Sequence, residues 1–392
     1  MYTSMLRNHR LEWVDNLRVA LTVLVVLHHA AQPYGPADWW YVEGQPRSGA
    51  LATLSAIDGS FFMSLFFFVS AVFIPGSYER RGARRFLGSR LVRLGIPVVV
   101  GALTIVPGLM YAYFVHYRGY PPMSFPRYFT DVYLGLGDEP AGWSGPSWPD
   151  LQFGHLWFVQ NLLAYTVVYA ALRRLSRPLR FPHGKPGRAL PLPGHRALVV
   201  LTVLLAAATF FVRLRYPLDE WVPFLDFLQV EPARVPQYVT FFALGVVAAR
   251  QNWLERFDAG VGRVWLGVGA TGVALLFLVG PDSNRFGPGG ADVPSASWAA
   301  YESLLCVALC VGLLTLFREL VQGSTPWSRE MAANSYAVYI IHLPVVVAMQ
   351  YGLADRGLSA AGSCFVVFVL AVPSAFLLAA GLRRLPAVRR VL

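Results

Sequence analysis

Residues 17–35 read LRVALTVLVVLHHAAQPYG, an apolar run with an arginine near one end and a His-His pair near the other. A helix needs about 20 mostly apolar residues to cross about 30 Å of hydrocarbon. Nine more blocks of comparable length follow, so the sequence predicts ten membrane-spanning helices. Their ranges are near 17–35, 58–76, 93–116, 154–172, 197–212, 236–250, 263–280, 299–317, 333–351 and 359–381.

The overall composition indicates the same class of protein. Hydrophobic residues make up 55% of the 392 residues and charged residues only 14%, whereas soluble domains carry about 25% charged residues. We therefore predict an all-α, polytopic helical bundle in which residues 1–392 form a single membrane domain. The three cysteines all fall within spans and are interpreted as small packing residues, and no metal site is expected.

The charge distribution predicts the orientation. With the N-terminus inside, the inside segments hold 25 of the 33 Lys and Arg residues but only 7 of the 22 acidic residues. Basic residues in short loops stay on the cytoplasmic side, so both termini are expected in the cytoplasm of a multi-pass protein of the cell (inner or plasma) membrane. The net charge of +11 then reflects topology and gives no reason to expect a nucleic-acid partner.

The longest outside stretch, residues 117–153, is rich in Pro, Gly, Trp and Tyr. Aromatic rings settle at the membrane interface. This stretch is expected to be either a lid or acceptor-binding surface, or an interfacial anchor.

Arg18 and His29 are predicted to share one face of the first helix. Eleven residues at 100° each return to within about 20° of the starting face and rise roughly 16 Å. An ionisable side chain deep in a span marks a candidate functional site. The alternative is that His29 only makes a helix-to-helix hydrogen bond.

Arg90 and Arg93 stand at the start of the third predicted span, three residues apart on one helical face. Their forked guanidinium groups suit the binding of phosphate. The alternative is a basic loop that touches anionic lipid.

Five motifs together resemble the acyltransferase-3 family of multi-span membrane acyltransferases, over nearly the whole chain. One departure is Ala71, where the family usually has glycine. Within the family, residues 14–18 and 93–97 look most like the branch that succinylates osmoregulated periplasmic glucans. The motifs are Arg18-x10-His29, Phe66-Phe67-Phe68-Val69-Ser70-Ala71, Arg90-x-x-Arg93, His155-Leu156-Trp157-Phe158 and Ser335-Tyr336-x-x-Tyr339-x-x-His342.

The resemblance implies an enzyme that transfers acyl groups other than aminoacyl groups. Its donor would be cytoplasmic acyl-CoA, either acetyl-CoA or succinyl-CoA, and its acceptor a hydroxyl of an extracytoplasmic glycan or lipid-linked sugar. His29 would be the general base, since a neutral imidazole can take the hydroxyl proton. An acyl-histidine intermediate also remains open. Arg90 and Arg93 would bind the CoA phosphates, with help from Arg18.

The remaining candidates have supporting roles. Asp58, at the outer end of the second predicted span, would orient His29 or bind the acceptor, unless it is a plain interfacial acid. Glu302, near the outer end of the eighth predicted span, is interpreted in the same way. The other predicted substrate-site residues are His155, Trp157, Tyr336, Tyr339 and His342, of which Trp157 is equally consistent with packing. The acyl group, the acceptor and the oligomeric state stay open.

A transporter or flippase for an anionic or sugar-linked substrate is the alternative function. Paired inverted halves with broken helices would favour it, and the sequence shows no such pairing.

Overall fold

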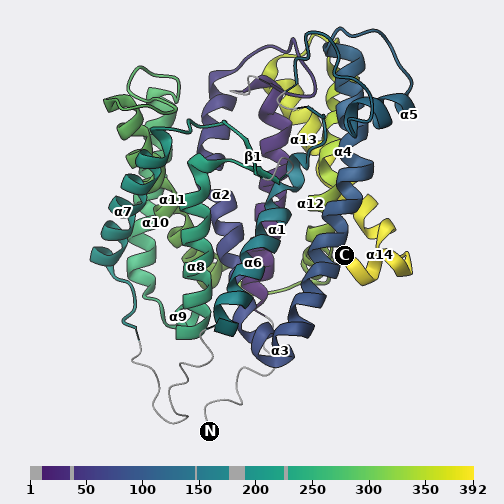
Figure 1. Cartoon of the computed structure of the whole chain (residues 1–392). Helices are drawn as coiled ribbons and strands as arrows, with labels where there is room; N and C mark the ends of the chain where they lie inside the picture. The colour runs from purple at the N-terminus through teal and green to yellow at the C-terminus, as the bar shows by residue number, and fades with distance from the viewer. Residues whose placement is uncertain (1–10, 36–38, 146–147, 176–189, 225–227) are drawn as a thin grey trace.

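The computed structural model describes residues 11–35, 39–145, 148–175, 190–224 and 228–392, which form one bundle of long helices (Figure 1). Nine helical segments of this described part are long and apolar enough to cross a membrane, which confirms an all-α polytopic membrane protein. They comprise α1 (Glu12–Ala31), α2 (Gly49–Val72), α3 (Ile74–Arg90) joined to α4 (Ile96–Tyr117), α6 (Trp157–Leu175), α7 (His195–Arg213), α10 (Ala259–Val279), α11 (Val293–Leu320), α12 (Pro326–Leu353) and α13 (Ala360–Leu382).

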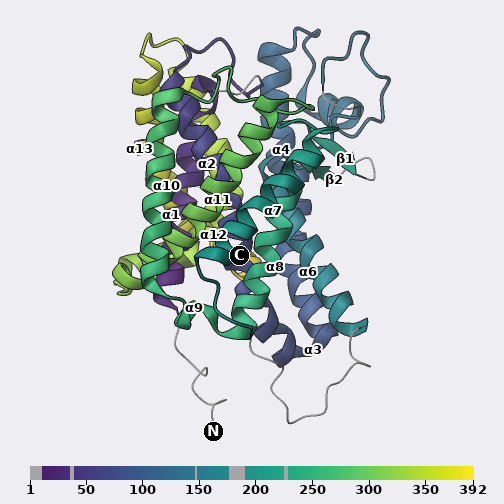
Figure 2. The same cartoon turned by 90° about the vertical axis from the view of Figure 1, so that its left-hand side faces the viewer.

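The predicted sixth span is α8 (Val235–Gln251), which has 17 residues and is shorter than these nine segments. It packs against α2 and α7 and runs lengthwise through the bundle (Figures 1 and 2). The sequence therefore located this helix correctly, and its crossing of the membrane remains a prediction.

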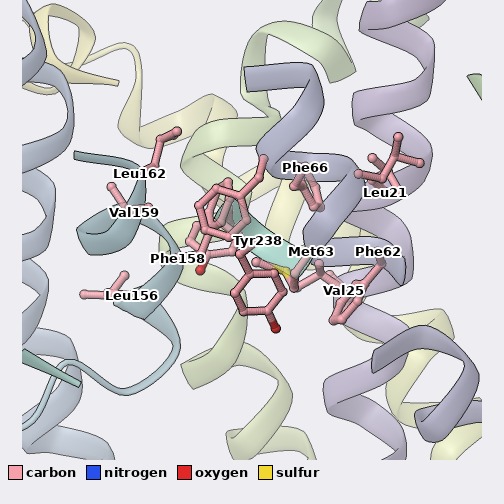
Figure 3. Packing of buried hydrophobic residues seen from close by; sticks show 14 of the residues in the cluster. Leu21, Val25, Phe62, Met63, Phe66, Leu156, Phe158, Val159, Leu162 and Tyr238 are labelled. Carbon is pink, nitrogen blue, oxygen red and sulfur yellow. The ribbon is translucent and has the colours of Figure 1, made fainter. Parts of the chain in front are cut away.

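The centre of the bundle is formed by α1, α2, α11 and α12, which pack against one another. Figure 3 shows part of the apolar core where α1 and α2 meet α6 and α8. Val25 of α1 and Phe62 of α2 are buried in this core, together with Phe158 and Tyr238 from the other two helices. In contrast, α7, α10 and α13 line the rim and bury less than a third of their membrane-length windows within the protein, as expected for contact with lipid.

Glycine allows two of the closest helix contacts. A Cβ on Gly245 of α8 would lie 2.4 Å from the Phe68 carbonyl oxygen of α2, and one on Gly262 of α10 would lie 2.0 Å from the Thr315 hydroxyl of α11. Small residues let membrane helices approach closely, so these two positions set the packing of α8 and α10.

Two helices begin earlier than hydropathy predicts. Ser48 caps α2 and Asp292 caps α11, each by accepting a hydrogen bond from a backbone N–H of the first turn. As a result Asp58 and Glu302 each lie nine residues inside a helix. The expectation that they sit near the outer helix ends is therefore wrong.

The third span also differs from the prediction. It is preceded by α3, a polar helix that continues through the π-helical segment Leu91–Gly95 into α4. Arg90 is the last residue of α3, and Arg93 lies inside the π-helical segment. The wider turn of a π-helix removes the simple i,i+3 alignment that the sequence suggested.

The two ends of the bundle differ in character. Figure 1 places the 117–153 stretch, with α5 (Phe125–Arg127), at one end, and α3 and α9 (Trp253–Arg256) at the other. A small antiparallel hairpin, β1 (Val222–Phe224) and β2 (Leu228–Val230), precedes α8, and the short α14 (Pro386–Val391) packs on the π-helical segment. Most of the predicted inside loop 173–196 lies outside the described residues.

The described part of the 117–153 stretch has a polar core of its own. Arg118 forms an ion pair with Asp150 at 3.2 Å, and the Tyr128 hydroxyl donates to the same carboxylate at 2.7 Å. Burial raises the pKa of Asp150 to about 6, although Arg118 acts in the opposite direction. This stretch is therefore folded and not merely a linker.

Candidate functional site

Three histidines from distant parts of the chain meet near the bundle centre. His29 comes from the last turn of α1, His342 from the middle of α12, and His155 from the turn before α6. The ring centroids of His29 and His342 are 4.9 Å apart, and those of His155 and His342 are 5.3 Å apart. The structure thus brings together three of the candidate residues.

The hydrogen bonds around His29 assign its tautomer. Its Nδ1 lies 2.8 Å from the Val25 carbonyl oxygen, which can only accept, so Nδ1 carries the proton. The same Nδ1 is 3.1 Å from Nε2 of His342, whose own Nδ1 lies 2.8 Å from the Tyr339 carbonyl oxygen. His342 therefore accepts through Nε2, and Nε2 of His29 keeps its lone pair.

Polar side chains from α12 and the first loop surround this pair. The Gln350 amide donates to the His29 carbonyl oxygen at 3.0 Å and accepts from the Trp40 indole N–H at 2.8 Å. The Trp40 ring centroid lies 5.8 Å from that of His29. His342 and Gln350 are fully buried, whereas His29 is half-buried, so His29 is the most accessible of these three residues.

The side chains of His155 and Tyr339 each donate a hydrogen bond to the backbone at or beside the other residue. Nε2 of His155 donates to the Ile340 carbonyl oxygen at 2.9 Å, and the Tyr339 hydroxyl donates to the His155 carbonyl oxygen. These bonds join the start of α6 to α12 beside His342.

Asp58 approaches His28 instead of His29. Its Oδ2 atom lies 3.8 Å from Nδ1 of His28, and within the part of the chain that the structure describes Asp58 forms no hydrogen bond or ion pair with His29. The two histidines are consecutive on α1 and point about 100° apart, so His28 faces α2 while His29 faces α12.

The arginine candidates lie toward the end of the bundle where α1 begins. Arg18 contacts Asp15 at 3.5 Å, and the Arg90 guanidinium lies 5.3 Å from the centre of the Phe86 ring. The Tyr336 hydroxyl donates to the Arg93 carbonyl oxygen at 2.7 Å. Since Tyr336 precedes His342 by six residues on α12, this contact lies roughly 9 Å along the helix from the histidines.

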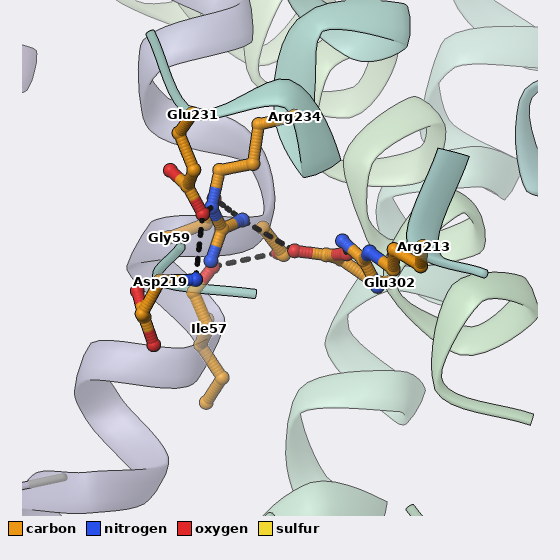
Figure 4. A network of polar contacts seen from close by, with 8 residues as sticks. Ile57, Gly59, Arg213, Asp219, Glu231, Arg234 and Glu302 are labelled. Carbon is orange, nitrogen blue, oxygen red and sulfur yellow. Dashed lines mark hydrogen bonds and ion pairs between the residues drawn. The ribbon is translucent and has the colours of Figure 1, made fainter. Parts of the chain in front are cut away.

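Glu302 is part of a buried network of charges (Figure 4). Its carboxylate receives hydrogen bonds from Arg213 at the end of α7 and from Arg234 just before α8. Arg234 also pairs with Glu231 at 3.1 Å and donates to the Gly59 carbonyl oxygen of α2 at 2.8 Å. Glu302 is thus satisfied by two arginines within the protein.

Trp157 lies in an aromatic cluster. Its ring stacks on Tyr238 with the centroids 5.3 Å apart and lies 5.7 Å from that of Trp221. This surrounding agrees with the packing interpretation of Trp157.

Sequence reasoning did not select four residues that complete this neighbourhood. Arg213, Arg234 and Gln350 are polar residues in or beside apolar helices, and that placement is itself a usable signal. His28 was visible as the neighbour of His29, but only the packing of α1 on α2 reveals that it faces Asp58.

A comparison with protein-family models finds a match along nearly the whole chain. A model of the acyltransferase-3 family, described as an acyltransferase domain, matches residues 11–384, which include every candidate site residue. The comparison with curated proteins finds no match.

Proposed function

The chain belongs to the acyltransferase-3 family, and from that premise we propose that it is a membrane O-acyltransferase with His29 as general base. It would move an acetyl or succinyl group from acyl-CoA to a hydroxyl of a glycan or lipid-linked sugar. One observation carries the proposal: the Val25 carbonyl and His342 together place the His29 proton on Nδ1, which leaves Nε2 able to accept another.

The proposed reaction uses the free lone pair on Nε2 of His29. A sugar hydroxyl is a weak nucleophile at neutral pH, so Nε2 of His29 takes its proton as the oxygen attacks the thioester carbonyl carbon. The carbon–sulfur bond then breaks, and the proton passes from Nε2 to the departing CoA thiolate. The products are an ester and free CoA. While His29 is charged, Nε2 of His342 stabilises it by accepting from Nδ1–H.

The donor would bind at the end of the bundle that carries α3. Arg93 is exposed and Arg90 half-buried there, and their guanidinium groups suit the CoA phosphates. The contact between Tyr336 and Arg93 supports a path along α12 from the phosphates to His342 and His29. Arg18, on the same side of the bundle as these arginines, would assist.

The acceptor would approach from the opposite end, where the folded 117–153 stretch lies (Figure 1). Tyr339 and His155 form a hydrogen bond beside His342 and would help to shape the substrate site. An extracytoplasmic glycan or lipid-linked sugar is consistent with the orientation that the basic residues predict.

The test is the release of free CoA from acetyl-CoA and succinyl-CoA by purified protein with glycan acceptors present. We expect His29→Ala to lower the acceptor-dependent rate by about 10²- to 10⁴-fold. The double variant Arg90→Ala/Arg93→Ala should instead raise the KM for acyl-CoA by about tenfold or more. Exposed Arg127, which pairs with Asp131 in the outer stretch, provides the control Arg127→Ala.

Two results would contradict the proposal. Acceptor-dependent release that persists in His29→Ala would exclude His29 as the base. No release from either donor, together with uptake of a sugar-linked substrate by vesicles that contain the protein, would favour the transporter.

A further inference from the structure

His28 carries a buried hydrogen-bond donor without an acceptor. Its Nε2 lies 2.7 Å from the amide nitrogen of Gln32, which can only donate, so the proton of His28 is on Nδ1. That Nδ1 has no hydrogen-bond partner among the residues the structure describes. The side chain of His28 is 15% exposed, so little water reaches it.

Asp58 supplies the complementary acceptor. Its side chain is only 3% exposed, and its Oδ2 atom also has no hydrogen-bond partner in the described ranges. The 3.8 Å from this oxygen to Nδ1 of His28 is too long for a hydrogen bond. A buried donor on His28 and a buried acceptor on Asp58 therefore face each other without forming a hydrogen bond. We call the space beside these two atoms the gap.

The two sides of the gap differ in polarity. On its inner side, one helical turn along each helix, are the buried side chains of Val25 of α1 and Phe62 of α2 (Figure 3). The Phe62 ring centroid is 5.0 Å from that of His28. On its outer side, one turn before Asp58 on α2, the buried Ser55 hydroxyl is also without a partner in the described structure. The gap is thus apolar below and polar above.

The chemistry of the gap selects its occupant. A cation would face the N–H of His28, and an anion would face the carboxyl group of Asp58. A hydroxyl to one side of the line between the two atoms satisfies both groups, because its oxygen accepts from His28 while its hydrogen is donated to Asp58. A buried polar group without a hydrogen bond raises the free energy of the protein. A hydroxyl that bonds to both groups would therefore gain binding free energy.

The position of the gap links it to the reaction. The ring centroids of His28 and His29 are 5.4 Å apart, so one small ring can offer hydroxyls to both. We propose that His28 and Asp58 bind a second hydroxyl of the acceptor, beside the hydroxyl that His29 deprotonates. This inference rests on the proposed function and names the substrate class: acceptors with neighbouring hydroxyls, such as sugars and polyols, in preference to single alcohols.

Acceptor binding without any acyl donor tests this inference separately from catalysis. Saturation-transfer NMR would measure the affinities of methyl β-glucoside and its monodeoxy analogues for the full-length protein, in a detergent without a sugar headgroup. We expect one deoxy analogue to bind the native protein about tenfold more weakly than the parent glucoside. In His28→Phe and in Asp58→Leu, this analogue and the parent glucoside should bind with equal affinity. The variant protein no longer offers a partner to the hydroxyl that the analogue lacks.

Matched variants complete the experiment. His28→Phe keeps a ring against Phe62, and His28→Asn keeps an N–H near the place of Nδ1 and should retain part of the discrimination. His195→Phe removes a histidine that contacts Trp265 at the far end of α7 and should leave the discrimination unchanged. The inference is overturned if the native protein does not bind the parent glucoside, or if both gap variants discriminate like the native protein. CoA release by native and His29→Ala protein decides the proposed function independently.

Discussion

His342 is the residue on which the protonation of His29 depends most. It is fully buried and accepts from Nδ1–H of His29 through Nε2. Because a hydrogen bond to a charged group contributes about 1.5–3 kcal/mol, His342→Leu should lower kcat by about 10- to 100-fold with little change in either KM. His342→Gln keeps an acceptor near the place of Nε2 and should recover part of the rate. Steady-state CoA release measures both, and a kcat within twofold of native in His342→Leu would refute this role.

Asp150 should make the stability of the outer stretch depend on pH. Burial raises its pKa in the folded protein from 3.8 to about 6, so the folded state holds a proton that the unfolded state has lost between these values. Protonation then favours folding, and stability should decrease as the pH rises from about 4 to 6, by up to about 1.4 kcal/mol per unit. Thermal unfolding of native and Asp150→Asn protein across this range would show it. Parallel pH profiles for the two proteins would count against this assignment.

At the scale of elements, the Glu302 network joins α2, α7, α8 and α11 (Figure 4). Removing one partner of a buried ion pair leaves an uncompensated charge and costs about 3–5 kcal/mol. Glu302→Gln should therefore reduce the free energy of unfolding by about that amount. Glu319→Gln, on the same helix, breaks a more exposed pair with Arg318 and should cost less than about 1 kcal/mol. Equal losses measured by thermal unfolding would mean that the network adds no stability.

The elements also show how far sequence reasoning reaches. Apolar length locates the helices because a span must cross the hydrocarbon, and the helical repeat places consecutive side chains such as those of His28 and His29 about 100° apart. Neither signal tells which neighbour a face meets. The interpretation that Asp58 orients His29 is therefore not supported, because Asp58 faces His28. Likewise Glu302 looked like an isolated acid because Arg213 and Arg234, its partners, are 89 and 68 residues away.

The whole molecule divides its proposed chemistry between two ends. The helix α12 contacts the arginine segment through Tyr336 and the base through His342. The folded outer stretch and the gap between His28 and Asp58 lie toward the other end. A donor and an acceptor that enter from opposite sides would therefore meet at His29 without sharing an entrance, provided that these ends face opposite sides of the membrane.

The topology of the second half of the chain depends on whether α8 crosses the bilayer, because ten spans place both termini on one side and nine do not. Cysteine substitutions at exposed sites on either side of α8 decide it, since the native cysteines are buried. We expect a membrane-impermeant maleimide to label Glu220→Cys and Asp138→Cys in intact cells. Arg84→Cys and Glu255→Cys should react only after permeabilisation, since basic segments stay inside. Labelling of Glu255→Cys in intact cells would show that α8 does not cross, and the ten-span topology would be wrong.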